Sequence, residues 1–169
     1  MALAAFSLMK RTGASPGSEA STNWDVGLIN DDSNSTDTGS YPIPVPETGY
    51  SYSYESWLRL KCTAAPDNAV ANIKVWFSAS APATGVALMI GTTASYATPT
   101  NEASTVATVN ATQYPDAGSA LAIGTPQSYD EISAINEYSD YIIVQLRVGP
   151  TAGQGNLPVQ VLHVRYDES

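Results

Sequence analysis

Two stretches in the middle of the chain alternate between apolar and other side chains, and this pattern constrains the fold most. Residues 57–62 read WLRLKC and residues 73–77 read IKVWF. Every second residue is apolar, namely Leu58, Leu60 and Cys62 in the first stretch and Ile73, Val75 and Phe77 in the second. We call each such set of alternate residues a parity of its strand, and this one the aliphatic parity. A period of two residues is typical of a β-strand with one buried face. In the next stretch, residues 86–90, both parities are small or apolar, which predicts a strand covered on both sides. We therefore expect three consecutive strands that begin a sheet.

Size and composition agree with a single all-β domain. A chain of 169 residues is usually one domain, and a domain of this size buries about 70% of its unfolded surface. Its Val, Ile, Tyr, Thr and Ser content favours strands and turns over helices. The net charge of −9 argues against binding of a phosphate backbone, so we expect no direct contact with nucleic acid.

The first fifty residues read as an arm. An apolar run at residues 3–9 predicts a short strand, and Lys10 and Arg11 are expected to mark its exit. Loose polar sequence follows, and YPIPVP at residues 41–46 has prolines at alternate positions, which enforce an extended backbone without ladder donors. We predict that residues 1–50 form an extended N-terminal arm or linker and that residues 51–169 form the β-sandwich domain.

The second half of the chain supplies the remaining strands. They are expected within residues 104–112, 120–124, 141–148 and 159–166, and the spacing of Ile132 and Ile135 predicts one short helix over residues 130–138. Seven to nine short strands separated by turn signals are the pattern of an antiparallel β-sandwich. The predicted fold is therefore all-β, an antiparallel sandwich of jelly-roll or Greek-key type with an N-terminal arm.

The N-terminus lacks the features of an export signal. Its positive charges follow the apolar run instead of preceding it, and the run is too short for a signal core or a membrane span. We expect synthesis in a host cytoplasm and no membrane contact. The single cysteine, Cys62, lies on the aliphatic parity of its strand and is expected to be a small buried residue.

The sequence contains no recognisable catalytic motif. His163 is the only histidine, which is too few for a multi-histidine metal site, and it is interpreted as a structural or rim residue. The acidic residues lie in predicted loops except Glu55, so a two-carboxylate glycosidase site is not expected. The run from Asp31 to Asp37 has part of the oxygen spacing of a calcium loop but lacks its closing glutamate, and we interpret it as a solvated linker. We predict no enzyme activity, no cofactor and no metal.

The non-aliphatic parity of the first two strands is the predicted contact surface. If these strands are neighbours in one sheet, two tryptophans and three basic residues share its outer face, a composition typical of protein contacts. The alternatives are an exposed cross-strand ladder and a face covered by the chain's own N-terminal arm. Two aromatic residues of the arm complete the predicted partner-contact set, which is Trp57, Arg59, Lys61, Lys74, Trp76, Trp24 and Tyr41.

The succession WLRLKC, NIKVWF and LMIGTT, preceded by a proline-containing arm in an acidic Ala/Ser/Thr/Gly-rich chain, resembles small structural proteins of tailed-phage virions. The resemblance covers the whole chain and rests on style and strand order. It implies a capsid decoration or minor capsid protein located in the virion. Its expected partners are the major capsid protein or other virion proteins and further copies of itself in a homo-oligomer. Proteins of this group have no catalytic residues.

Two other roles remain open from the sequence. One is a component of the tail, neck or fibre of the same kind of particle. The other is a carbohydrate-binding β-sandwich used in host attachment, because sugar binding needs aromatic platforms beside polar groups. The residues that would supply such platforms are Tyr50, Tyr52, Tyr54, Trp57 and Trp76.

Overall fold

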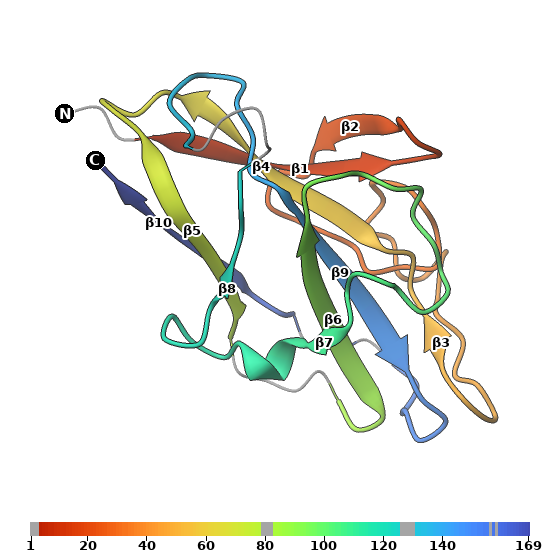
Figure 1. The fold of residues 1–169 in the computed structure, drawn as a ribbon. Helices are drawn as coiled ribbons and strands as arrows, with labels where there is room; N and C mark the ends of the chain where they lie inside the picture. The colour runs from red at the N-terminus through yellow and green to blue at the C-terminus, as the bar shows by residue number, and fades with distance from the viewer. Residues whose placement is uncertain (1–3, 79–82, 126–130, 156, 158) are drawn as a thin grey trace.

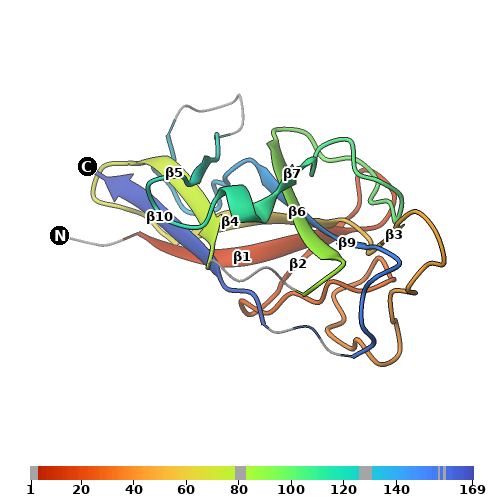
Figure 2. The same ribbon diagram turned by 90° about the horizontal axis from the view of Figure 1, so that it is seen from below.

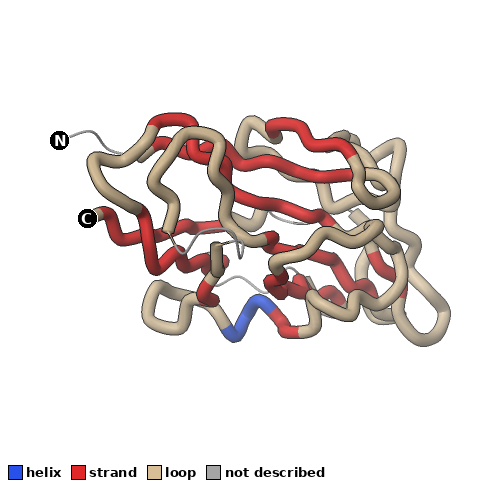
Figure 3. The backbone as a smooth tube through the Cα atoms, turned by 45° about the horizontal axis from the view of Figure 1, so that its top comes forward, coloured by secondary structure: helices blue, strands red, loops and turns tan. Residues whose placement is uncertain are grey.

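The structure, a computed structural model, describes residues 4–78, 83–125, 131–155, 157 and 159–169. Its strands and one short 3₁₀-helix are connected mainly by loops (Figures 1 and 3). In chain order they are β1 (Ala5–Thr12), β2 (Ser18–Ser21), β3 (Ser51–Tyr52), β4 (Ser56–Ala64), β5 (Val70–Phe77), β6 (Val86–Thr93), β7 (Val109–Asn110), η1 (Ala111–Gln113), β8 (Leu121–Ala122), β9 (Tyr141–Val148) and β10 (Leu162–Glu168).

The strands form two antiparallel sheets that pack against each other, which confirms the predicted all-β sandwich. The large sheet has the order β2-β1-β4-β9-β6-β7, and β3 also pairs with β9. The small sheet has the order β10-β5-β8. The start of β1 and the end of β10 lie at the same end of the molecule (Figures 1 and 2), where the amide of Ala4 donates to the Glu168 carboxylate at 3.1 Å.

The short strand predicted near the start of the N-terminal arm is β1, and it lies inside the large sheet. β1 lies between β2 and β4, and it continues through both basic residues that were expected to end it. The sheet accommodates their charges locally. Lys10 is 3% exposed, and its Nζ donates to the carbonyl of Ser33 at 2.6 Å. Arg11 donates to the Tyr141 hydroxyl at 2.6 Å.

The first two predicted strands are not neighbours in one sheet. β4 lies in the large sheet and β5 in the small one, joined by residues 65–69. Both edges of β4 are already occupied, by β1 on one side and by β9 on the other. β9 pairs with the first part of β4, and residues 137–139, just before β9, pair with its second part on the same edge. There the amide of Cys62 donates to the carbonyl of Glu137 at 2.9 Å. β5 therefore crosses to the opposite layer.

The main core fills the space between the sheets. It consists of the aliphatic parities of β4 and β5 together with one parity of β6 and β9, and Leu60, Ile73, Ile90 and Ile142 are each at most 1% exposed. A second apolar cluster lies on the outer face of the large sheet, under the loop that contains Tyr96 and Val106. β6 is consequently covered on both sides, as its sequence predicted.

The predicted helix over residues 130–138 is wrong; Asp130 itself lies outside the described residues, and the remainder is loop. Ile132 is fully buried because it exchanges hydrogen bonds with Val70, whereas Ile135 is 56% exposed. Bonding to flanking strands therefore replaced helical bonding. The strands expected at residues 104–112 and 120–124 are shorter than predicted, since only β7 and β8 form there. β9 has the predicted bounds, and β10 begins three residues later than predicted.

Candidate functional site

Separation of β4 from β5 divides the predicted contact surface into two unrelated parts. Trp57 is 2% exposed and belongs to the second apolar cluster, so it is not available to a partner. Its ring packs edge-on against Tyr96 and Tyr141 with centroid distances of 5.2 and 5.7 Å. Its indole Nε1 donates to the Glu55 carboxylate at 2.9 Å. The expected exposure of Trp57 on an outer face is therefore wrong.

Arg59 and Lys61 of β4 contact side chains from elsewhere in the chain. Arg59 donates two hydrogen bonds to the Glu19 carboxylate, at 2.5 and 2.9 Å, and its guanidinium lies 3.7 Å from the centroid of the Tyr138 ring. Burial opposes its charge, but Glu19 and two tyrosines outweigh it and raise the pKa of Arg59. Lys61 is half-buried, 6.0 Å from the same ring. Because Glu19 lies in β2, this surface is covered by the N-terminal segment, which was one of the predicted alternatives.

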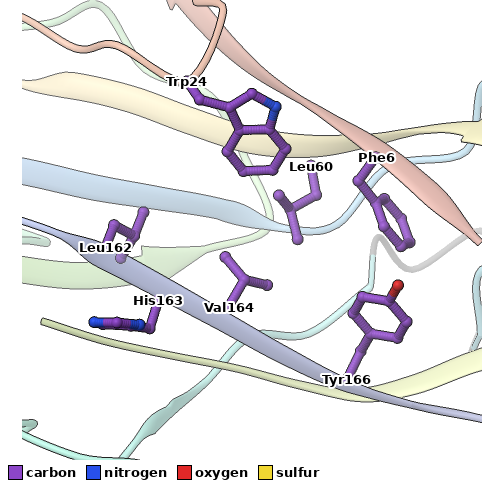
Figure 4. Close-up of a pocket in the computed structure, with 7 residues that line it drawn as sticks. All are labelled: Phe6, Trp24, Leu60, Leu162, His163, Val164 and Tyr166. Carbon is purple, nitrogen blue, oxygen red and sulfur yellow. The ribbon is translucent and has the colours of Figure 1, made fainter.

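The other part of the predicted surface is accessible, on the outer face of the small sheet. Trp76 of β5 stacks on His163 of β10 with ring centroids 5.1 Å apart and planes inclined by 8°. At the position two residues further along the two strands, Lys74 of β5 lies directly opposite Arg165 of β10, and both are exposed. We call these four residues the basic face. Figure 4 shows His163 on the opposite side of β10 from Leu162.

The basic face carries the exposed basic side chains of this molecule. The chain contains seven lysines and arginines. Of these, Lys74 and Arg165 are exposed, and the other five are buried or half-buried. Like charges directly opposite each other in a sheet are destabilising, so the fold gains nothing from this pair. Asp167 offsets it only in part, at 3.7 Å from Arg165, and also accepts a hydrogen bond from Asn72. The arrangement suits an anionic group placed over the sheet.

The two arm residues of the predicted contact set are exposed. Trp24 is 57% exposed at a left-handed backbone position with φ of 63°, and its amide donates to the Thr22 hydroxyl at 3.1 Å. Tyr41 is 40% exposed, and its carbonyl accepts from the amide of Asn30 at 3.0 Å. Both side chains are accessible, and their role in contacts stays a prediction.

Trp24 also lies over a groove between the two sheets, which is lined mainly by aliphatic and aromatic residues and which we call the edge groove (Figure 4). The groove has a volume of about 370 Å³ and lies between β1 and β4 on one side and β10 on the other. His163 lies at its rim, and its walls are Phe6, Leu60, Leu162, Val164 and Tyr166. Phe6 and Tyr166 close one end through an edge-on ring contact with a centroid distance of 5.2 Å.

The residues screened for chemistry have structural roles. Cys62 is fully buried as predicted, and burial raises the pKa of its thiol. Glu55 is 4% exposed and accepts from Trp57 and from the amide of Thr100. The Asp37 carboxylate accepts from the amides of Gly39 and Ser40 and from the Ser40 hydroxyl, so it closes a local turn. Within the described residues, no group of three or more His, Cys, Asp or Glu side chains is placed to hold a metal ion.

Comparison of the chain with protein-family models, with curated proteins and with solved structures found no match. Among the described residues, no helix has the length and apolarity required to span a membrane.

Sequence reasoning missed the partners that make these sites. Glu19 of β2 converges on Arg59 with Tyr138 and Tyr141, which lie just before and at the start of β9. No local sequence pattern predicts that these two distant segments meet there. For Arg165 a signal existed, because it shares its strand parity with His163. That parity alone does not tell which strand lies beside β10, so its pairing with Lys74 required the sheet.

Proposed function

We propose that this chain is a non-enzymatic assembly protein that binds an acidic protein surface through the basic face. The proposal is carried by the like-charged pair of Lys74 and Arg165, which Asp167 offsets only in part, beside the stack of Trp76 and His163. An acidic partner would relieve the repulsion between the two cations and cover the aromatic stack. Aromatic rings and basic groups that become desolvated together are typical of the residues that dominate protein interfaces.

The assembly in this proposal is a phage particle. The resemblance to small tailed-phage virion proteins supports a capsid decoration or minor capsid role, in which the chain binds the major capsid protein and neighbouring copies. A β-sandwich with two accessible surfaces, the basic face and the edge groove, suits a protein that connects neighbours. A place in the tail, neck or fibre would use the same surfaces on other partners.

Co-sedimentation with capsid shells assembled without this chain tests the proposal. Wild-type protein is expected to bind the shells, less tightly as salt is raised, because exposed charges are screened. Lys74→Glu and Trp76→Ala are each expected to weaken binding by about thirty-fold, the size of an interface hot spot. Lys61→Glu is the matched control, since it changes net charge equally but lies on the large sheet.

Two results would overturn the proposal. One is the absence of shell binding by the wild-type chain at low salt. The other is binding that neither Lys74→Glu nor Trp76→Ala weakens, with all variants folded by circular dichroism. Hits on a glycan array that Trp76→Ala abolishes, together with no shell binding, would instead support the carbohydrate-binding role.

A further inference from the structure

One edge of the small sheet is open in the described residues. The sheet order β10-β5-β8 gives β10 a neighbour on one side. The amide of Phe77 donates to the carbonyl of Tyr114, on the side of β5 away from β10. Its ladder partner Leu162 therefore directs its backbone N–H and C=O to the free edge. Alternation along the strand extends this to Val164, Tyr166 and Glu168.

Proline and lysine, which commonly block strand addition at a sheet edge, are absent from this edge. β10 reads LHVRYDE, and its charged residues are Arg165, Asp167 and Glu168. Because they carry both signs, they disfavour some registers of an added strand and favour others. The register shift in this ladder coincides with the left-handed Asn72, φ 51°, which lies in β5 and leaves the alternation of β10 intact. β10 therefore presents a regular edge, and its inward side chains Leu162, Val164 and Tyr166 line the edge groove.

The outward side chains of β10 include one cation, Arg165, and one anion, Asp167, so the strand is complementary in charge to a second copy of itself. In antiparallel pairing about a two-fold axis at Tyr166, Arg165 of each copy lies opposite Asp167 of the other. A centre at Arg165 or at Asp167 would place like charges opposite each other, which is unfavourable. A centre at Val164 places Arg165 opposite His163 and forms no ion pair. The Tyr166 centre is the register with two complementary pairs.

We infer that the chain forms a symmetric dimer by antiparallel pairing of β10 with β10 of a second copy, centred on Tyr166. The two small sheets then form one continuous sheet of six strands, β8-β5-β10 followed by β10-β5-β8 of the partner copy. The Tyr166 rings meet at the axis, each backed by its own Phe6. Pairing along the edge engages Arg165 but leaves Lys74, Trp76 and His163 of both copies on one surface of the joined sheet, where two contacts strengthen binding to a repeated partner.

Mixing of charge-reversed chains tests the dimer and its register. In sedimentation of the isolated protein, Arg165→Asp and Asp167→Arg are each expected to self-associate at least about ten-fold more weakly than the wild type, because each homodimer places like charges opposite twice. An equal mixture is expected to form heterodimers, since the aspartate introduced in one variant then faces the arginine introduced in the other. The intrachain Arg165–Asp167 pair is exposed and contributes little to folding, so all variants should remain folded.

A second measurement reports the register directly. Residues opposite each other in an antiparallel ladder are close enough for a disulfide. Chains with Arg165→Cys mixed with chains with Asp167→Cys are expected to cross-link under mild oxidation faster than either variant alone. Cys62 is fully buried and should not compete.

The inference is overturned if the wild-type chain stays monomeric at high micromolar concentration. It is also overturned if mixing the two charge variants does not restore association, or if the cysteine variants cross-link no faster when mixed. These measurements contain no shell, and the shell experiment uses Lys74 and Trp76 instead. Failure of one proposal is therefore distinguishable from failure of the other.

Discussion

Trp76 and His163 stack almost in parallel across two strands of the small sheet, with ring centroids 5.1 Å apart and planes inclined by 8°. Because they occupy directly opposite positions in the ladder between β5 and β10, the stack also reports on the pairing of these two strands.

The stack should contribute measurable coupling to stability. In a double-mutant cycle of Trp76→Ala and His163→Ala, the coupling free energy is expected to be about 0.5–1 kcal/mol, the range for cross-strand aromatic pairs. Urea unfolding of the four proteins measures it. A coupling of zero would show that the rings are adjacent without stabilising each other.

Trp57→Ala should impair folding before it impairs any contact. Trp57 is 2% exposed and packs against two tyrosines, so its truncation is expected to cost about 3–5 kcal/mol. Thermal unfolding measures the loss, with Trp24→Ala as the control because Trp24 is 57% exposed. Equal melting temperatures for the two variants would contradict the buried position of Trp57.

Gln145 organises the loop over the large sheet. Its side chain is fully buried, its Nε2 donates to the carbonyl of Glu102 at 2.7 Å, and its Oε1 accepts from the amide of Ser104 at 3.0 Å. Gln145→Leu leaves these backbone groups unpaired, with an expected loss of about 2–3 kcal/mol. Hydrogen exchange should show faster exchange of the Ser104 amide. Glu102→Ala, which keeps the carbonyl, should leave it unchanged.

Asp140 should make stability depend on pH in the acidic range. Burial raises the pKa of Asp140 above its ordinary value, and its Oδ1 has no hydrogen-bond partner among the described residues. The native state therefore binds the proton more tightly than the unfolded chain. This favourable contribution is present at low pH and is lost as pH rises through the folded-state pKa.

Asp140→Asn removes that titration. The variant is expected to be more stable than the wild type by about 1 kcal/mol at neutral pH, because it buries no charge. The difference should shrink as pH falls, since the wild-type carboxyl becomes neutral. Melting temperatures measured from neutral pH to about pH 4, near the ordinary pKa of an aspartate, test this, and a constant difference across the range would refute it.

Several strands could be predicted from local pattern because each buries one parity in the core. The alternation at residues 57–62 and 73–77 identified β4 and β5, and the apolar run at 141–148 identified β9. The same rule failed for β1, because Lys10 and Arg11 resemble a strand end until their partners Ser33 and Tyr141 are known. It also failed at Ile132, where hydrogen bonds to a distant strand replaced the helix.

The predicted contact surface shows the same limit at the level of a site. Trp57 and Trp76 each lie on the non-aliphatic parity of their own strand. Only Trp76 is accessible, since β4 and β5 lie in different layers. Parity tells which residues share a face of one strand. It does not tell which strand comes next to it or what lies over that face.

The sequence by itself determined that this chain is an all-β sandwich, since an alternation of two residues has one stable solution, a strand with its apolar side buried. It also determined that Cys62 is buried. Only the tertiary structure decided that Arg59 is enclosed by Glu19 and Tyr138 while Arg165 is exposed opposite Lys74. The physical reason is that hydrogen-bonded pairing between distant strands, which local periodicity does not encode, sets the neighbours of every outward side chain.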